Sequence, residues 1–274
     1  MVNSNDSTVA NFILLGLTDV PFLQTLYFSL LLTIYILTIS GNVLIITVVL
    51  LNAQLHSPMY FFLTNLSCID ISLSSSVVPK LLVNTLSHDK SISFVGCAAQ
   101  VYVTGALGST ECIILAIMAY DRYVAICHPL QYYTVMNEKF CIYLASGTWS
   151  VSFLQTLVNE IYMYIETGII ALSSFLLTII SYVYIISSIL KITSTRGKYK
   201  TFSTCASHFT VVTLFYGNIL IAYMHPKSSY SAERDRALSL FYTAVTPMLN
   251  PIIYSMRNKV FISSLRNIFN KKYP

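Results

Sequence analysis

The stretch MAYDRYVAICHPL, residues 118–130, sets an acidic and a basic side chain next to each other at the end of an apolar run. The run extends from Val101 to Tyr120, and Asp121 and Arg122 follow it directly. Charged side chains are costly within the hydrocarbon of a bilayer, so we expect this pair where the membrane meets water. Arg122 is there either a topological anchor only, or a switch residue that reaches a partner's carboxylate or carbonyl groups. In both cases the stretch predicts a membrane-spanning helix that ends at the pair.

The composition of the whole chain also favours a membrane protein. Of its 274 residues, 55% are hydrophobic and only 10% are charged, and the mean hydropathy is +0.67. Soluble domains carry about 25% charged residues. The net charge of +5 fits membrane topology better than a nucleic-acid footprint. No Cys or His pair within a loop has the spacing of a metal site. Because no cleavable signal peptide is visible, we expect the first span to act as its own insertion signal.

Seven apolar runs are long enough to cross a bilayer, which takes about 20 residues. The predicted fold is therefore all-α: a seven-transmembrane helix bundle that forms a single domain over residues 1–274. The spans are expected at about 22–51, 59–82, 97–122, 140–158, 161–190, 202–224 and 237–256. Residues 257–274 alternate basic and apolar side chains, which predicts a short amphipathic helix on the inner leaflet.

The boundary between the fourth and fifth spans is the least defined. The chain from Cys141 to Leu190 is almost continuously apolar, and as one helix it would be about 75 Å long, more than twice the hydrocarbon thickness. It must turn back, either at Asn159-Glu160 or at Gly168. A turn at the first position leaves almost no outer loop.

Lys and Arg residues in the loops predict the orientation. With the N-terminus outside, eleven of the 16 Lys and Arg residues lie on the inner side and five on the outer side. We therefore expect residues 1–21 to be extracellular and residues 257–274 to be cytoplasmic. Asn5 begins the sequon Asn-Asp-Ser, which is a usable glycosylation site in this orientation.

Five further motifs occur in order along the chain. They are Gly41-Asn42, LHSPMYFFL at 55–63, Ser181-Tyr182, KTFSTCASH at 200–208 and PMLNPIIY at 247–254. Together with residues 118–130, they resemble the olfactory receptors, within the rhodopsin-like G-protein-coupled receptors. Phe215-Tyr216-Gly217, without a proline, also resembles the sixth helix of olfactory receptors more than that of most other rhodopsin-like receptors.

The resemblance implies a receptor rather than an enzyme. The expected partners are a small volatile odorant, a heterotrimeric G protein of the stimulatory, olfactory type that raises cyclic AMP, and the lipid bilayer. No nucleic acid and no cofactor are expected, apart from a sodium ion considered below. The implied location is the plasma membrane, with retention in the endoplasmic reticulum as the alternative.

Residues at the inner ends of the helices are implied by the resemblance to couple to the G protein. This set comprises Asp121, Arg122, Tyr123, Tyr182, His208, Asn250, Pro251 and Tyr254. Pro251 removes a helix hydrogen bond and so permits a kink. The family mechanism implies that Tyr182 and Tyr254 move toward Arg122 on activation. His208 lies beside the inner cavity or is a packing histidine.

Two acids lie deep within spans, where ionised groups are expensive and usually functional: Asp70 in the second and Glu111 in the third. Asn42 and Asn250 could supply amide partners. The resemblance implies that these four residues cluster, with a sodium ion or bridging waters between them. The alternative is a pair of protonated carboxyl groups bonded to their neighbours.

Small and aromatic side chains line the expected ligand pocket in the outer half. Helical spacing puts Thr104, Gly105, Gly108, Ser109 and Cys112 on one face of the third span. Tyr216, Ile219, Leu220 and Tyr223 share a face of the sixth, and Glu166 and Thr243 complete the candidate set. Such a face suits small, mostly apolar molecules. Close helix packing through small residues is the alternative.

One segment of the olfactory receptors is missing here. The family carries a long second outer loop, and one of its cysteines is joined to the position of Cys97, which has no visible outer partner in this chain. Folding and signalling of a receptor-like chain could therefore be impaired. A transporter or channel would need paired half-helices or an internal repeat, and none is visible. An intramembrane enzyme would need a nucleophile and a base on one face, which are also not seen.

Overall fold

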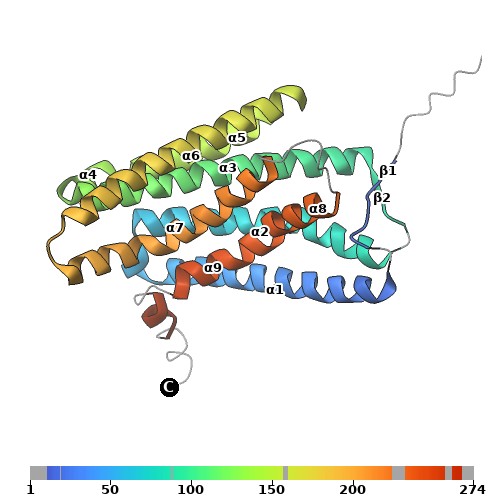
Figure 1. Ribbon diagram of the computed structural model, residues 1–274, viewed down its shortest axis with the longest axis horizontal. Coiled ribbons are helices and arrows are strands. Elements are labelled where there is room, and N and C mark those ends of the chain that lie inside the picture. The colour runs from blue at the N-terminus through green and yellow to red at the C-terminus, as the bar shows by residue number, and fades with distance from the viewer. Residues whose placement is uncertain are drawn as a thin grey trace, which may run out of the picture.

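The protein is described here by a computed structural model, which covers residues 11–18, 20–87, 89–156, 160–223, 232–256 and 261–266. Within these ranges, the side chains of residues 160–167, 200, 204, 222–223, 232–235 and 255–256 are not described. The molecule is a bundle of long helices lying side by side, with one pair of short strands at one end (Figure 1). The predicted all-α fold is confirmed.

Seven helical rods make up the described bundle. Six are single helices: α1 (Pro21–Leu51), α2 (Pro58–Leu86), α3 (Phe94–Cys127), α5 (Glu138–Gln155), α6 (Glu160–Lys191) and α7 (Thr195–Tyr223). The seventh joins α8 (Ala232–Leu240), the π-helical turn η4 (Phe241–Val245) and α9 (Thr246–Met256). Short turns η1 (Ala53–Leu55), η2 (Pro129–Gln131) and α4 (Tyr132–Val135) connect the rods.

Length and hydropathy identify spans most clearly in the first half of the chain. In the described ranges, four helices could each cross a membrane: Pro21–Leu51, Pro58–Leu86, Phe94–Cys127 and Gly168–Lys191. The segments Thr195–Ser203 and Cys205–Ile221 are bent by 45° and make a fifth span when taken together. The other two rods are α5, of 18 residues, and the composite α8–η4–α9.

Local sequence explains where several helices begin. A proline stands in the first turn of both α1 and α2, where its missing N–H is not needed. Ser93 caps α3 by accepting a hydrogen bond from the amide of Gly96, at 3.1 Å. Asn137 caps α5 by accepting one from the amide of Phe140, at 3.0 Å.

Helix α3 runs through the middle of the bundle and packs against α2, α5, α6 and α7. The largest buried cluster is centred on α2 and α3 and includes Phe62, Leu115 and Met118. By contrast, α1 and α6 expose many large apolar side chains, such as Leu30 and Leu176, on their outer faces. Such faces suit a hydrocarbon solvent.

A glycine allows α1 and α9 to approach closely. A Cβ atom placed at Gly41 would lie 3.1 Å from both Cβ and Cγ of Pro251. The proline of the last span therefore rests directly on the backbone of the first. The sequence placed these two residues in separate motifs and did not predict their contact.

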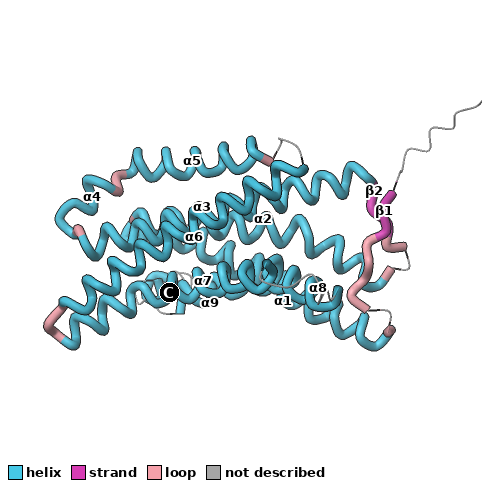
Figure 2. Tube along the Cα trace, turned by 45° about the horizontal axis from the view of Figure 1, so that its top comes forward, coloured by secondary structure: helices cyan, strands magenta, loops and turns pink. Residues whose placement is uncertain are grey.

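The two ends of the bundle differ. We call the end with α4 and the α6–α7 connection the inner end, and the end with the strands the outer end, following the predicted orientation (Figure 2). At the outer end, β1 (Asn11–Ile13) pairs antiparallel with β2 (Ser91–Ser93), with Phe12 opposite Ile92. This pairing was not predicted, because residues 11–13 have no period-two pattern long enough to indicate a strand.

The connection between α5 and α6 is short, as expected for the predicted turn at Asn159-Glu160 rather than for the one at Gly168. Helix α5 ends at Gln155 and α6 begins at Glu160, so Gly168 lies within α6. The turn therefore precedes Gly168. The predicted boundary at residue 158 falls on residues 157–159, which lie outside the described ranges.

The chain after α9 is described only at residues 261–266, which are helical. Phe261 is buried in the largest cluster of the bundle. The start of the predicted amphipathic segment therefore packs an aromatic side chain against the bundle. Asn5 and residues 267–274 lie outside the described ranges.

Candidate functional site

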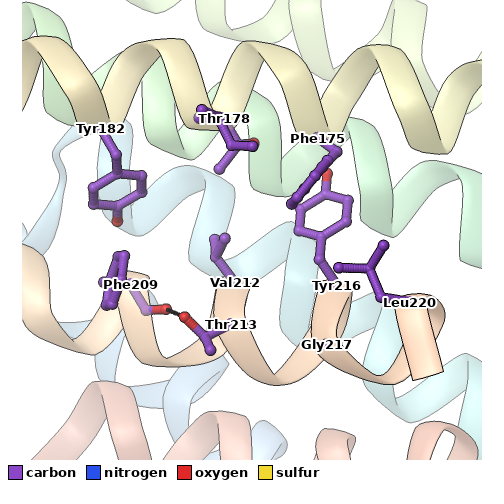
Figure 3. A pocket seen from close by; sticks show the side chains of 10 residues that line it. Phe175, Thr178, Tyr182, Phe209, Val212, Thr213, Tyr216, Gly217 and Leu220 are labelled. Atoms are coloured by element: carbon purple, nitrogen blue, oxygen red, sulfur yellow. Dashed lines mark hydrogen bonds between the residues drawn. The ribbon is translucent and has the colours of Figure 1, made fainter.

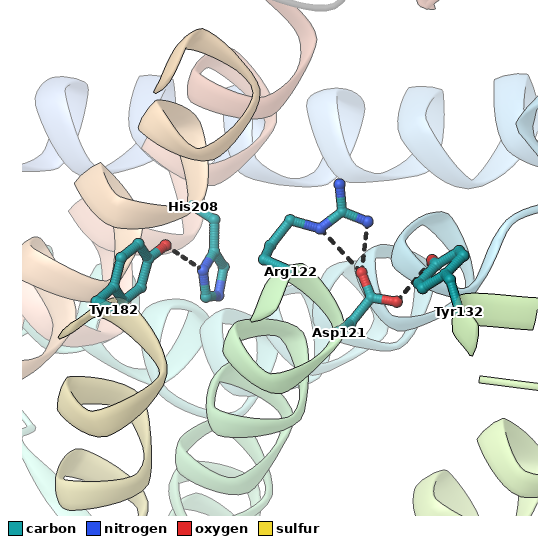
Figure 4. A network of polar contacts seen from close by, with 5 residues as sticks. All are labelled: Asp121, Arg122, Tyr132, Tyr182 and His208. Carbon is teal, nitrogen blue, oxygen red and sulfur yellow. Dashed lines mark hydrogen bonds and ion pairs between the residues drawn. The ribbon is translucent and has the colours of Figure 1, made fainter. Parts of the chain in front are cut away.

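Arg122 is held by its own neighbour at the inner end of α3. Its Nε donates to Oδ2 of Asp121 at 2.9 Å, and its Nη2 pairs with the same oxygen. The hydroxyl of Tyr132 donates to the other oxygen, Oδ1, at 2.8 Å (Figure 4). Asp121 is fully buried. Burial first, and the charge of Asp121 next, raise the pKa of the Tyr132 hydroxyl above its ordinary value, so it is a donor at neutral pH.

A second pair lies beside this network, between α6 and α7. Tyr182 Oη and His208 Nδ1 are 2.7 Å apart, and their rings stack with centroids separated by 5.9 Å. Both side chains are buried. His208 Nε2 and the hydroxyl of Tyr254 are buried without a hydrogen-bond partner. His208 thus fixes the position of the Tyr182 side chain, a contact that suits both a switch residue and a hydrogen-bonded packing histidine.

Tyr123 differs from the other residues of the predicted coupling set. Its hydroxyl lies 3.0 Å from Nε2 of His128, and its ring contacts that of Tyr184. It therefore packs toward α6 rather than joining the Asp121 network.

The polar centre brings together some of the four residues that were expected to cluster. The side-chain amide of Asn250 donates to both carboxylate oxygens of Asp70, at 3.1 and 3.0 Å. Asn42 donates to the carbonyl groups of Thr38 at 3.0 Å and Pro247 at 3.1 Å. The side chain of Asn42 thus links α1 to the backbone of the seventh rod.

Glu111 has a partner that the sequence did not indicate. Its Oε2 accepts a hydrogen bond from the hydroxyl of Tyr242, at 3.3 Å. Tyr242 lies in the π-helical turn η4, and its hydroxyl occupies the space beside Gly108, where a Cβ atom would lie 2.8 Å from it. Gly108 therefore makes room for a tyrosine, which agrees with the packing interpretation of that small residue.

Several buried oxygens around this centre have no hydrogen-bond partner. They are Asn42 Oδ1, Ser67 Oγ, Ser109 Oγ, Glu111 Oε1 and Asn250 Oδ1. Hard cations prefer such oxygen ligands. Among the described residues, no group of three or more His, Cys, Asp and Glu side chains could hold a metal ion. The donor set therefore fits a sodium ion better than a transition metal.

The predicted ligand residues divide between helix packing and one α3–α7 contact. The hydroxyl of Tyr216 points to the carbonyl oxygen of Cys112 at 3.4 Å, so the two predicted faces do meet. Ser109 and Cys112 are buried. The remaining hydroxyl groups satisfy their own helices: Thr104 donates to Gln100 O and Thr243 to Ser239 O. Ile219 packs partly against the core, and Gly105 is half-buried on α3.

Two members of the predicted ligand set, Glu166 and Tyr223, have side chains outside the described part of the structure.

A cavity of about 220 Å³ lies between α6 and α7 (Figure 3). Of the predicted ligand face its lining contains Tyr216 and Leu220, and of the coupling set it contains Tyr182. The complete lining is Phe175, Thr178, Ile179, Tyr182, Phe209, Val212, Thr213, Tyr216, Gly217 and Leu220.

Cys97 is half-buried near the outer end of α3. None of the six cysteines, all of which the structure describes, forms a disulfide. In the family, a cysteine of the second outer loop is joined to the position of Cys97. That cysteine has no counterpart between Gln155 and Glu160 in this chain.

Comparisons with known proteins agree in every part of the chain. A family model described as seven-transmembrane receptor (rhodopsin family) matches residues 41–167, and one described as olfactory receptor matches residues 154–272. The chain is 44% identical to human olfactory receptor 12D3 and 40% identical to human olfactory receptor 2G6, in each case over 98% of this chain and 96% of the relative. It is 39% identical to rat olfactory receptor 1f45, over 100% of this chain and 99% of that protein.

The alignment lengths bear on the short α5–α6 connection. The comparison with olfactory receptor 12D3 extends over 305 positions, which exceeds the 274 residues of this chain, so the relative carries residues that this chain lacks. The two family models meet at residues 154–167, where α5 gives way to α6.

Proposed function

Because this chain belongs to the olfactory receptor family of rhodopsin-like, seven-helix membrane receptors, we propose that it binds small, mostly apolar odorants and passes the signal to a heterotrimeric G protein. The family consists of receptors rather than enzymes. We further propose that the G protein is the stimulatory, olfactory type, and that its activation raises cyclic AMP. The bilayer is the solvent for the helices.

The hydrogen bonds at the inner end of the bundle support this proposal. Arg122 is bonded to Asp121, while Tyr182 is bonded to His208 and the hydroxyl of Tyr254 has no partner. Tyr182 and Tyr254 are both buried. In the part of the chain that the structure describes, no hydrogen bond joins either hydroxyl to Arg122, which is what a resting state requires.

Activation then exchanges one set of hydrogen bonds for another. Outward movement of the inner end of α7 carries His208 away from Tyr182. Tyr182 and Tyr254 become free to reach Arg122, and the space vacated by α7 admits a helix of the G protein. An odorant drives this change only if it binds the open state more tightly than the closed one.

The ligand pocket is proposed in the outer half, between α3 and α7. Tyr216 and Cys112 already meet there, and they adjoin Glu111 and Tyr242 of the polar centre. Where a sodium ion occupies this centre, Asp70, Glu111 and Asn250 are the residues that would hold it, and the ion would supply positive charge between the two acids.

The switch proposal is tested by measuring odorant-evoked cyclic AMP in cells that express a stimulatory, olfactory-type G protein. Arg122→Ala should abolish the response at matched surface level. Arg196→Ala is the control, because Arg196 is an exposed arginine of the same inner side. An Arg122→Ala response equal to that of the unmutated chain would contradict the proposal.

The orientation and delivery of the chain are tested separately. We propose a plasma-membrane protein with an extracellular N-terminus, glycosylated at Asn5. An impermeant maleimide should then label Cys97 on intact cells, and Asn5→Gln should remove a glycosidase-sensitive shift in gel mobility. Cys112→Ser is the control for the first assay, because Cys112 is buried and should not contribute to labelling.

A second candidate is a receptor-like chain that no longer signals. The short connection between α5 and α6 favours it, because the family's longer loop covers the pocket. Surface labelling of Cys97 without any odorant response, over a broad panel, would support this candidate.

A further inference from the structure

The cavity between α6 and α7 is a groove that opens toward the bilayer rather than toward the centre of the bundle. Its back wall is buried and includes Thr178, Val212 and Tyr216. Its rim consists of large apolar side chains that remain exposed: Ile179 is 41% exposed and Phe209 is 48% exposed. The rim residues lie within the hydrophobic spans of both helices. A molecule therefore reaches this groove from the hydrocarbon layer.

The lining selects for a neutral ligand of small size. No Asp, Glu, Lys or Arg is among the lining residues. The volume of about 220 Å³ is below the roughly 300–1,000 Å³ of sites for drug-sized ligands. A whole phospholipid or sterol is too large to be enclosed, whereas a small volatile molecule fits.

Two threonine hydroxyl groups in the lining determine which neutral ligands can form a hydrogen bond in the groove. Thr178 donates its hydroxyl hydrogen to the carbonyl oxygen of Ser174, at 2.8 Å, and Thr213 donates to that of Phe209, also at 2.8 Å (Figure 3). Both donors are thus already used within their own helices. The oxygen atoms still have lone pairs, so the wall can accept a hydrogen bond from a ligand but has no free threonine hydrogen to give.

We propose that this groove is a second binding site, on the α6 side of Tyr216 and sharing that residue with the odorant pocket, for small aliphatic or aromatic alcohols that partition into the bilayer. The ligand's hydroxyl donates to Thr213, which lies at the exposed side of the groove, and its apolar part packs against Phe175 and Leu220. Tyr182 forms the inner part of the lining and also holds His208. A bound alcohol therefore touches the pair that the proposed switch would separate.

Gly217 provides a direct way to fill the groove. A Cβ atom added there meets no atom within 4 Å, and Gly217 lines the cavity, so a larger side chain at this position would extend into the cavity. Gly147 on α5 is a matched control, since a Cβ atom there also meets nothing within 4 Å and the residue is remote from the groove. Both changes replace a glycine in a helix interior, so neither should impair folding.

The experiment is photolabelling of the full chain in phosphatidylcholine vesicles with a diazirine derivative of octan-1-ol. Labels should concentrate on residues 175–182 and 209–220, and Gly217→Leu should remove them while Gly147→Leu leaves them unchanged.

Competition against this label tests the preference for alcohols. Octan-1-ol should compete better than octyl methyl ether, which cannot donate a hydrogen bond, by roughly fivefold, as one hydrogen bond implies. Thr213→Val should abolish that preference, and Thr47→Val, which removes an equivalent exposed hydroxyl on α1, should not.

Uniform labelling of all lipid-facing helices, unaffected by Gly217→Leu, would mean simple partitioning into the bilayer and would overturn the proposal. Equal competition by the ether would overturn the assignment to alcohols. Labelling needs neither a G protein nor a signal, so the result is independent of the proposed odorant response. A chain that is labelled as expected but never raises cyclic AMP would contradict the proposed function alone.

Discussion

The inner and outer ends of this molecule are held together by different kinds of contact. At the inner end, side chains bond to side chains: Asp121 binds Arg122 and Tyr132, and Tyr182 binds His208. At the outer end most ties involve the main chain. The amide of Leu14 donates to Lys90 O at 2.9 Å, and Arg236 donates to Gly16 O at 2.8 Å. Carbonyl groups are present in every residue, so the acceptors of the outer contacts do not depend on residue type, although the donor does where it is a side chain such as that of Arg236.

This difference between the two ends indicates where side-chain substitutions should have the larger effect on stability and signalling. Removing a side chain at the inner end leaves a buried partner without its bond or contact. At the outer end the same change leaves most backbone ties in place. The following predictions compare the two ends, or weaken one of them, in order of decreasing effect.

Truncating an aromatic side chain should destabilise the inner part of the bundle far more than the outer end. Phe62→Ala removes a ring that is fully buried in the main cluster, at a cost of about 3–5 kcal/mol. Phe12→Ala removes a ring of β1 that is 43% exposed and should cost less than about 1 kcal/mol. Thermal unfolding of the two variants in the same detergent measures the contrast. Similar losses for both would show that the outer strands contribute more than the contacts indicate.

An added methyl group should break the contact between Glu111 and the π-helical turn. Gly108→Ala places its Cβ only 2.8 Å from the hydroxyl oxygen of Tyr242, which is closer than van der Waals contact, so we expect that hydroxyl to shift away from Glu111. We expect a loss of about 1–3 kcal/mol, because a buried carboxyl group is left without its partner. Tyr242→Phe should reproduce the effect, and Gly147→Ala is the control with open space around it. Gly108→Ala as stable as the unmutated chain would refute this account of the contact.

Loosening the Asp121 network should raise signalling in the absence of odorant. Tyr132→Phe removes one hydrogen bond to Asp121, worth about 1 kcal/mol, and so favours release of Arg122 by roughly fivefold. Basal cyclic AMP at matched surface level is the measurement. Tyr133→Phe is the control, since Tyr133 is exposed and adjacent. Unchanged basal activity would mean that Tyr132 only packs against the helix end.

The smallest effect is expected from acid at the outer end. Hydrogen bonds from Ser91 lower the pKa of the Asp89 carboxyl below its ordinary value. Because the folded-state pKa is the lower one, the stabilisation is present above the unfolded pKa of about 3.9 and is lost as pH falls through the folded value. The protection of the Ser91 amide, meaning its exchange rate relative to that of an unstructured amide at the same pH, should therefore fall at low pH in the unmutated chain. Asp89→Asn should show no such dependence; if it shows the same one, Asp89 is not the group responsible.

Part of the polar centre could be expected from the sequence, because the family resemblance implied that Asp70 and Asn250 cluster, and they are hydrogen-bonded. The bond between Arg122 and its own neighbour Asp121 was not predicted, because the sequence left open whether Arg122 is an anchor or reaches a partner's groups. The contacts made by Tyr132 and Tyr242 could not be predicted, since tyrosine is common in this chain. Residues 241–245 also give no signal of a π-helical turn, and that turn decides which way Tyr242 points.

The backbone contacts of the outer end were also beyond prediction. Strand β1 consists of three residues, and its pairing with β2 depends on where α2 ends and α3 begins rather than on a pattern in the strand itself. Tyr123 illustrates the opposite case. It belongs to a motif, yet its position on α3 turns it toward Tyr184 and away from Asp121.

The contact between Gly41 and Pro251 restricts how the seventh rod can move. The proline ring lies against the backbone of α1, where even a methyl group on Gly41 would require the ring to shift. Closer approach of α9 to α1 is therefore disfavoured, and separation would remove the packing contact. We expect rotation about the contact to be the easier motion. Pro251 would then act as a pivot, so that a small displacement of α8 and η4 on one side is accompanied by an opposite displacement of Tyr254 on the other.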